Sequence, residues 1–171
     1  DMKFRRIVWQ IYLPYLFLIL FVLIGSGWYM SITVRAFYYN DTVKDLRARA
    51  QLISQQLQGR FDESHREALS QLVEQLGQRS GTRITIIRLD GLVLADSHED
   101  ARRMEDHSGR PEIMAAVSQG EGSTVRFSNT LGQTLMYVAL AYQESGNLLG
   151  TVRTSVSVTD IDQALDAVSA A

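Results

Sequence analysis

The chain has 171 residues, of which 17 are Lys or Arg and 19 are Asp or Glu, so its formal net charge at pH 7 is −2. This slightly acidic balance argues against a nucleic-acid partner, because the phosphate backbone attracts basic surfaces. The chain contains no cysteine, which excludes disulfides, thiolate metal sites and a cysteine nucleophile. Its stability must therefore come from an apolar core.

The first predicted element is a membrane-spanning helix. About 28 residues between Arg6 and Arg35 carry no charge, which is enough to cross a hydrocarbon core of about 30 Å. Basic residues crowd positions 1–6, so the positive-inside rule places them in the cytoplasm. We expect residues 7–34 to anchor the chain in the cytoplasmic membrane, with an extracytoplasmic domain beyond. A cleaved secretory signal is the alternative, but the apolar core of a signal peptide is typically about half as long as the apolar stretch of this chain.

The next predicted element is a helical stalk. Apolar residues recur at spacings of three and four from Thr42 to Leu57, which predicts one amphipathic helix. No Pro or Gly separates Met30 from Gln58, so we expect the membrane helix to continue into this stalk. The apolar stripe could pack on its own domain, or it could pair with a second chain as a parallel coiled coil. In the second case the homodimer interface would be formed by Leu46, Ile53 and Leu57.

The remaining sequence changes from helical to strand patterns. A second amphipathic helix is predicted over 63–78, which completes a helical segment over 35–80. A hairpin follows, turning at Asp90-Gly91, a dipeptide typical of the type I′ turn. Pro111 is placed to start a short helix, with the Glu112 carboxylate favourable near its N-terminus. Strands are expected at 84–89, 92–95, 124–128, 134–142 and 148–158, giving a sheet domain over 81–158 and an exit helix over 159–171.

Taken in order, these elements resemble the extracytoplasmic sensor of PhoR-type sensor histidine kinases. The resemblance covers roughly residues 51–165 and is strongest at 90–97 and 110–112. It implies an α+β, PAS-like, single-Cache fold, in which a five-stranded antiparallel sheet is flanked by helices. The stretches that carry it are GTRITIIRLDGLVLADS, HSGRPEIMAAVSQGEG, STVRFSNTLGQTLMYVALAY and TDIDQAL.

The resemblance also implies how such a receptor works as a whole. In that family a dimeric kinase lies beyond a second membrane helix, uses ATP and Mg to phosphorylate a histidine, and signals to a response regulator, often for phosphate limitation. This sequence ends at Ala171, where that second membrane helix would begin. We therefore expect the input part of a longer receptor, with no kinase module and no cofactor in this chain.

Strand alternation suggests where a ligand could bind. Arg126, Tyr137 and Arg153 occupy positions of one face on three of the predicted strands. If these faces coincide, the three residues would form a cationic pocket for a small carboxylate or phosphate. The alternative is an ordinary solvated sheet face, on which arginines are common.

The densest set of possible metal ligands lies in 96–107. It contains five acidic residues together with His98 and His107, but it lacks the spacing of an EF-hand loop and is interrupted by Arg102 and Arg103. We therefore predict a solvated loop and no metal site. A pH-sensing role for the two histidines is compatible with their intrinsic pKa, although nothing in the sequence selects it.

Other functional classes remain open at this stage. The same sensor could serve a chemoreceptor or a diguanylate cyclase, or the chain could be a membrane-tethered module that contacts another periplasmic or membrane protein. The sequence shows no glycine-rich phosphate loop, nucleophile elbow or metalloprotease helix. We therefore predict no catalytic residues in this chain.

Overall fold

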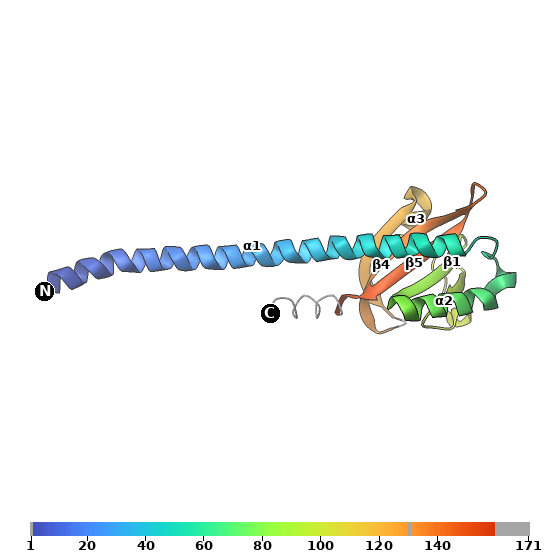
Figure 1. The fold of residues 1–171 in the computed structure, drawn as a ribbon, viewed down its shortest axis with the longest axis horizontal. Coiled ribbons are helices and arrows are strands. Elements are labelled where there is room, and N and C mark those ends of the chain that lie inside the picture. The colour runs from blue at the N-terminus through green and yellow to red at the C-terminus, as the bar shows by residue number, and fades with distance from the viewer. Residues whose placement is uncertain (1, 130, 160–171) are drawn as a thin grey trace. The chain divides into compact units, whose positions relative to one another are not determined.

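The computed structural model describes residues 2–129 and 131–159. The chain divides into two compact units, residues 1–40 and residues 41–171. In the first unit every described residue belongs to helix α1 (Met2–Gln56), which includes Pro14 (Figure 1). Its large apolar side chains between Tyr12 and Met30 are exposed, and the helix is long and apolar enough to cross a membrane. These properties agree with the expected membrane anchor.

The second unit is an α+β domain, as predicted. The last part of α1 leads through a short 3-10 helix, η1 (Glu63–His65), into α2 (Arg66–Ser80). Five antiparallel strands then form one sheet in the order β2-β1-β5-β4-β3. These are β1 (Arg83–Arg88), β2 (Val93–Asp96), β3 (Glu121–Ser128), β4 (Gln133–Glu144) and β5 (Asn147–Ser157), and between β2 and β3 come η2 (Ala101–Arg103) and α3 (Pro111–Gln119).

The β1–β2 and β4–β5 hairpins use different turns. In β4–β5 the pair Ser145-Gly146 connects the strands with φ of 52° and 81°, as a type I′ turn requires. The type I′ turn predicted at Asp90-Gly91 is wrong, because Ser145 alone among the described non-glycine residues has a positive φ. Instead the Gly91 N–H donates to the Arg88 carbonyl at 2.9 Å, and a β-bulge follows Ile86.

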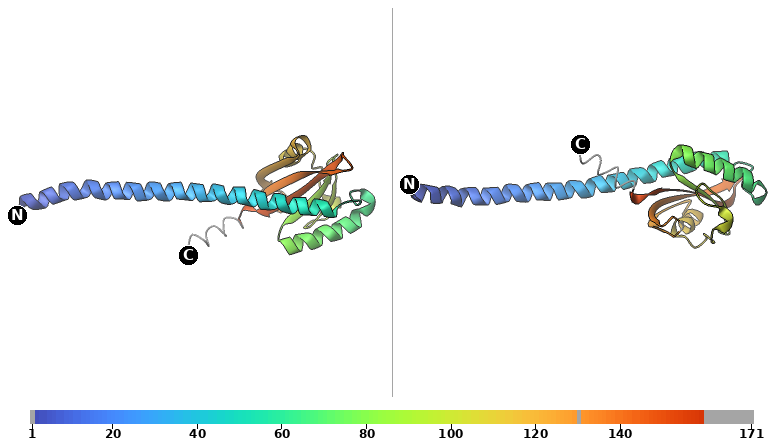
Figure 2. Two further views of the ribbon diagram at one scale, coloured as in Figure 1. Left: turned by 45° about the horizontal axis from the view of Figure 1, so that its top comes forward. Right: turned by 90° about the horizontal axis from the view of Figure 1, so that it is seen from below.

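The main core lies between one sheet face and the helices α1 and α2. Figure 2 shows both helices on the same side of the sheet, with α3 on the other. Phe61, in the connection between the helices, stacks on Tyr142 of β4 with ring centroids 4.5 Å apart. Other large contributors are apolar side chains from the two helices, from the residue that follows α1 and from four strands: Ile53, Leu57, Leu69, Val73, Ile84, Ile86, Leu94, Leu140 and Val152.

The apolar stripe of α1 is covered by this core, within the same chain. Leu46, Ile53 and Leu57 are only 2%, 5% and 0% exposed within this single chain, and Ile53 and Leu57 belong to the core that includes residues of α2 and the sheet. The Thr154 hydroxyl of β5 also donates to the Leu46 carbonyl at 2.9 Å. A homodimer interface built from these three side chains would require the core to open, so that assignment of residues needs correction. Dimerisation itself stays a prediction and needs another face of the domain.

Helix α3 covers part of the opposite face of the sheet. It packs closely on β3 at Gly122, where a Cβ atom would lie 2.3 Å from the Glu112 carbonyl oxygen. Ile113 and Ala116 of α3 are buried in a small apolar cluster on this side. The rest of this face combines buried Leu135 and Tyr137 with charged and hydroxyl side chains, and it contains the candidate site. The exit helix expected over 159–171 lies almost entirely outside the described residues.

Replacing Ile53 with Asp tests the position of the stripe. The variant Ile53→Asp buries an uncompensated carboxylate and should lower the free energy of unfolding by about 3 kcal/mol or more. The neighbouring Leu52 is 61% exposed, so Leu52→Asp should change stability by only about 0.5 kcal/mol or less. Urea-dependent proteolysis of the full chain in detergent measures both. Equal stability of the two variants would contradict the packing described here.

Candidate functional site

The sheet register brings the three predicted ligand residues onto one face. Tyr137 of β4 lies opposite Ser155, Arg153 of β5 lies opposite Ala139, and Arg126 of β3 lies opposite Leu135. The Cζ atoms of Arg126 and Arg153 lie 4.2 Å and 4.9 Å from the centroid of the Tyr137 ring. Tyr137 is therefore in cation–π contact with two arginines. Tyr137 and Arg153 are also buried, which excludes a solvated face at these positions.

The three residues line a cavity of about 290 Å³ between the sheet and the segment that precedes α3. The cavity has a strongly basic lining. The basic lining residues are Arg83, Arg103, Arg110, Arg126 and Arg153, with His107 beside them. The acidic lining residues are Glu99, Asp100 and Glu105. Such a lining suits an anionic group, because guanidinium forks match carboxylate and phosphate geometry.

Glu112 completes the site, although the sequence indicated only a helix start there. It is the second residue of α3 and is fully buried. One of its carboxylate oxygens accepts hydrogen bonds from Arg126 Nη2 at 2.9 Å and from Arg153 Nη1 at 3.1 Å. Burial alone would raise the pKa of Glu112, but the Arg126 hydrogen bond and the Arg153 charge outweigh it and lower the pKa. Glu112 is therefore an anion at neutral pH.

Arg153 is the most deeply buried cation of the site. Burial lowers the pKa of its guanidinium to about 10, while the Glu112 carboxylate opposes this shift, so the group remains charged at neutral pH. Its Nη2 donates to the Thr85 hydroxyl at 3.1 Å. Within the described part of the chain, the buried Nε atoms of Arg153 and Arg110 have no hydrogen-bond partner. Both residues line the cavity, so unsatisfied donors lie beside it.

A second buried ion pair lies next to the first. Arg83 Nε donates to both carboxylate oxygens of Asp96 at 3.1 Å and 3.0 Å. Asp96 also accepts from the Thr85 hydroxyl and from the backbone N–H groups of His98 and Glu99. All these bonds hold the loop after β2 against the sheet, so Asp96 is a structural group. Across the described ranges, no group of three or more His, Asp or Glu is placed to hold a metal ion.

His107 borders the same cavity as a neutral base. It is 6% exposed, and its Nδ1 lies 2.7 Å from the Glu105 carbonyl oxygen, which assigns the ring proton to Nδ1. Burial, and then the positive charge of Arg153, lowers the pKa of His107 to about 4. A histidine with this pKa does not change charge near neutral pH.

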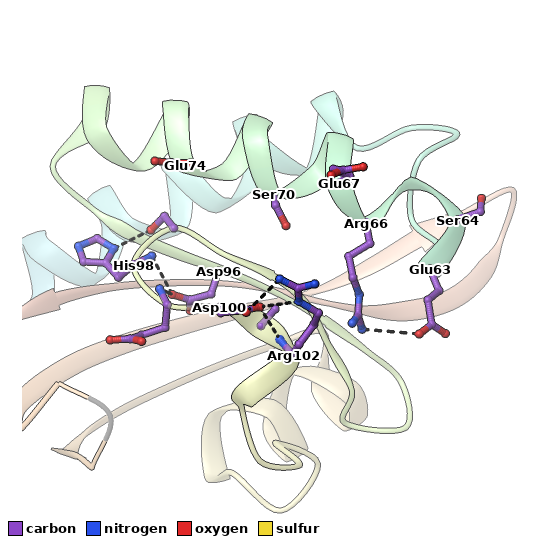
Figure 3. Close-up of a pocket in the computed structure, with 13 residues that line it drawn as sticks. Glu63, Ser64, Arg66, Glu67, Ser70, Glu74, Asp96, His98, Asp100 and Arg102 are labelled. Atoms are coloured by element: carbon purple, nitrogen blue, oxygen red, sulfur yellow. Dashed lines mark hydrogen bonds and ion pairs between the residues drawn. The ribbon is translucent and has the colours of Figure 1, made fainter.

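A larger, more open cavity of about 690 Å³ lies between α2 and the segment after β2. Figure 3 shows Arg66 and Ser70 pointing from α2 toward Asp100 and Arg102. Its two arginines pair locally, since Arg66 lies 3.8 Å from Glu63 and Arg102 lies 3.1 Å from Asp100. Exposed pairs of this kind contribute little energy. The smaller basic cavity, with its buried charges, is therefore the better candidate site.

Comparison with known proteins identifies the fold. By sequence, the chain matches no family of known proteins and no curated protein. By structure, it is similar to the sensor domain of the Vibrio cholerae histidine kinase DctB, with 14% identity and a TM-score of 0.58 over 79% of this chain and 59% of that domain. The Escherichia coli DcuS sensor domain matches with 16% identity and a TM-score of 0.61 over 76% of this chain and 98% of that domain.

A chemoreceptor domain matches equally well. The ligand-binding domain of the Pseudomonas aeruginosa amino acid chemoreceptor PctC, in complex with GABA, has 15% identity and a TM-score of 0.62 over 75% of this chain and 63% of that domain. This chain thus spans less than two thirds of the DctB and PctC domains and nearly all of the DcuS domain. At these identities the likeness establishes the fold alone. The described domain has the PAS-like/Cache fold found in sensor domains of both histidine kinases and chemoreceptors.

Proposed function

We propose that this chain is the membrane-anchored extracytoplasmic input region of a signalling receptor, and that its basic cavity binds a small anionic ligand. The observation that carries the proposal is the pair of arginines around Tyr137, the buried Arg153 and the partly buried Arg126, which share the Glu112 carboxylate and border a cavity. Burying such charges is costly. Guanidinium groups around a cavity are the feature expected of a site that receives an anion.

The ligand class follows from the site chemistry. Two guanidinium groups favour a carboxylate or phosphate oxygen pair, and the buried Tyr137 ring holds both of them by cation–π contact. The cavity of about 290 Å³ suits a small molecule. Similar domains support this class, since PctC is described with GABA and the Campylobacter jejuni chemoreceptor Tlp3 with isoleucine.

A sensor histidine kinase of the PhoR type is our preferred receptor. The resemblance in the strand and turn sequences supports the PhoR type, while the sensor domains of DctB and DcuS support a histidine kinase without indicating its type. A homodimer, downstream kinase modules that use ATP and Mg, and a response regulator belong to this proposal. A chemoreceptor is supported by PctC and Tlp3. A diguanylate cyclase, or a tethered module that binds a periplasmic or membrane protein, is the further alternative.

The proposed membrane topology can be tested with single cysteines, because the chain has none of its own. Glu74→Cys, at an exposed position of α2, should react with a membrane-impermeant maleimide in intact cells. Lys3→Cys should react only after lysis, because positive residues are retained in the cytoplasm. The reverse pattern of labelling would overturn the orientation.

Ligand binding can be tested by a thermal-shift screen of the full chain in detergent with small carboxylates, amino acids and inorganic phosphate. At least one compound should raise the melting temperature in a saturable way. Arg126→Gln should weaken its binding about tenfold or more, because it removes a charged hydrogen-bond donor. The exposed Arg60 lies outside the cavity, so Arg60→Gln is the matched control. A screen without any saturable shift would favour the protein-interaction module.

The neutral state of His107 makes a separate prediction about pH. Its pKa is about 4 in the folded chain and about 6.5 when unfolded. Between these values the unfolded state binds more protons, so stability falls as pH is lowered through this window. His107→Asn keeps an N–H donor and cannot titrate, so its melting temperature should fall less from pH 6.5 to pH 4. The exposed His98 provides the matched exchange His98→Asn. An unchanged pH dependence in His107→Asn would contradict the buried neutral histidine.

A further inference from the structure

Glu112 occupies the position in which a bound carboxylate would be expected. Its Oε1 lies between Arg126 Nη2 and Arg153 Nη1, and its Oε2 lies 3.4 Å from Arg126 Nε. This two-oxygen contact with Arg126 is the bidentate arrangement by which a guanidinium recognises a free carboxylate. The Glu112 side chain thus provides a carboxylate, which is the kind of group that the two arginines are suited to bind.

The geometry of α3 makes this contact possible. Gly122 lets the first turn of α3 approach β3 so closely that no Cβ would fit beneath the Glu112 carbonyl. Arg126 on β3 and Arg153 on β5 then hold the Glu112 side chain from the sheet side. Because Glu112 is fully buried, its carboxylate cannot leave the arginines unless the first turn of α3 shifts. The occupant of the two arginines is therefore linked to the position of α3.

The charges of the cluster are not balanced. Two guanidinium groups share the single Glu112 carboxylate, and no other Asp or Glu among the described residues forms an ion pair with Arg126 or Arg153. Arg153 Nε remains buried without a partner, and the adjoining cavity provides volume beside the cluster. An incoming anion would thus meet cations that are only partly neutralised.

We infer that the Arg126–Arg153 pair is an anion-binding site whose resting occupant is Glu112, so that an anionic ligand binds in competition with this carboxylate and releases the first turn of α3. The inference rests on the proposed anion-sensing function and deepens it. Glu112 then acts as a built-in competitor, which sets the ligand concentration at which the domain responds. The ligand can cause such a response only if it binds the domain more tightly in one position of α3 than in the other.

Chemical rescue tests the inference. Glu112→Ala removes the carboxylate and should lower the melting temperature of the full chain in detergent. Sodium acetate or propionate should then raise it in a saturable way, while sodium chloride at equal ionic strength should not. The wild type should show no comparable rise with acetate. A Glu112→Ala chain that responds to acetate no more than to chloride would overturn the inference.

A matched control comes from an exposed ion pair. Glu121 contacts Arg47 at 2.6 Å with both side chains about half exposed, so Glu121→Ala should show no acetate rescue. If Glu112→Ala does not fold, Glu112→Gln keeps the shape and removes the negative charge. Glu112→Gln should bind acetate or inorganic phosphate about tenfold more tightly than the wild type, and equal binding would overturn the inference.

The test separates this inference from the proposed function. If the screen finds a ligand for the wild type but Glu112→Gln binds it no more tightly, Glu112 is not a competitor, although the chain is an anion sensor. If acetate rescues Glu112→Ala but no compound binds the wild type, the internal site exists without the proposed sensing function.

Discussion

Two carboxylates hold three guanidinium groups inside this domain. Asp96 pairs with Arg83, and Glu112 pairs with both Arg126 and Arg153. Charges withdrawn from water are tolerated only with partners, and removing one partner of a buried pair typically costs about 3–5 kcal/mol. The loop after β2 and the first turn of α3 are therefore held on the sheet by charge as well as by packing. Every other feature of the candidate site depends on these contacts.

One face of the sheet contributes mainly to stability, and the other carries the candidate binding site. The face toward α1 and α2 is apolar and provides most of the core. The opposite face has only a small apolar cluster, and the rest of it carries the charged groups. Strand alternation makes this division possible, because neighbouring residues of one strand point to opposite faces. A domain of this size can therefore bury a sufficient core and still keep a polar cavity.

Much of this arrangement could be predicted from the sequence. Period-two patterns located all five strands to within a few residues, and alternation placed Arg126, Tyr137 and Arg153 on one face. The role of Glu112 could not be predicted, because its partners lie 14 and 41 residues away and meet it only through tertiary packing. A lone Glu in the first turn of a helix also has a sufficient local explanation.

The partner of the α1 stripe and the turn at Asp90-Gly91 could not be predicted for reasons of the same kind. The stripe of α1 fits either an intramolecular core or a coiled coil, since both need the same spacing of apolar residues. Only the position of the sheet shows which partner covers Ile53 and Leu57. The turn at Asp90-Gly91 has the composition of a type I′ turn, but the bulge after Ile86 changes the strand register before the turn begins. Local composition does not contain that information.

Strand β5 joins the candidate site to helix α1 through two consecutive residues. Arg153 contacts Glu112 on one face, and the Thr154 hydroxyl donates to the Leu46 carbonyl on the other. Consecutive Cα atoms are fixed about 3.8 Å apart by covalent geometry, so a displacement of one residue along the strand carries the other with it. A hydrogen bond weakens steeply when its geometry is lost. Any displacement of Arg153 along β5 would therefore also change the geometry of the hydrogen bond between Thr154 and the Leu46 carbonyl of α1.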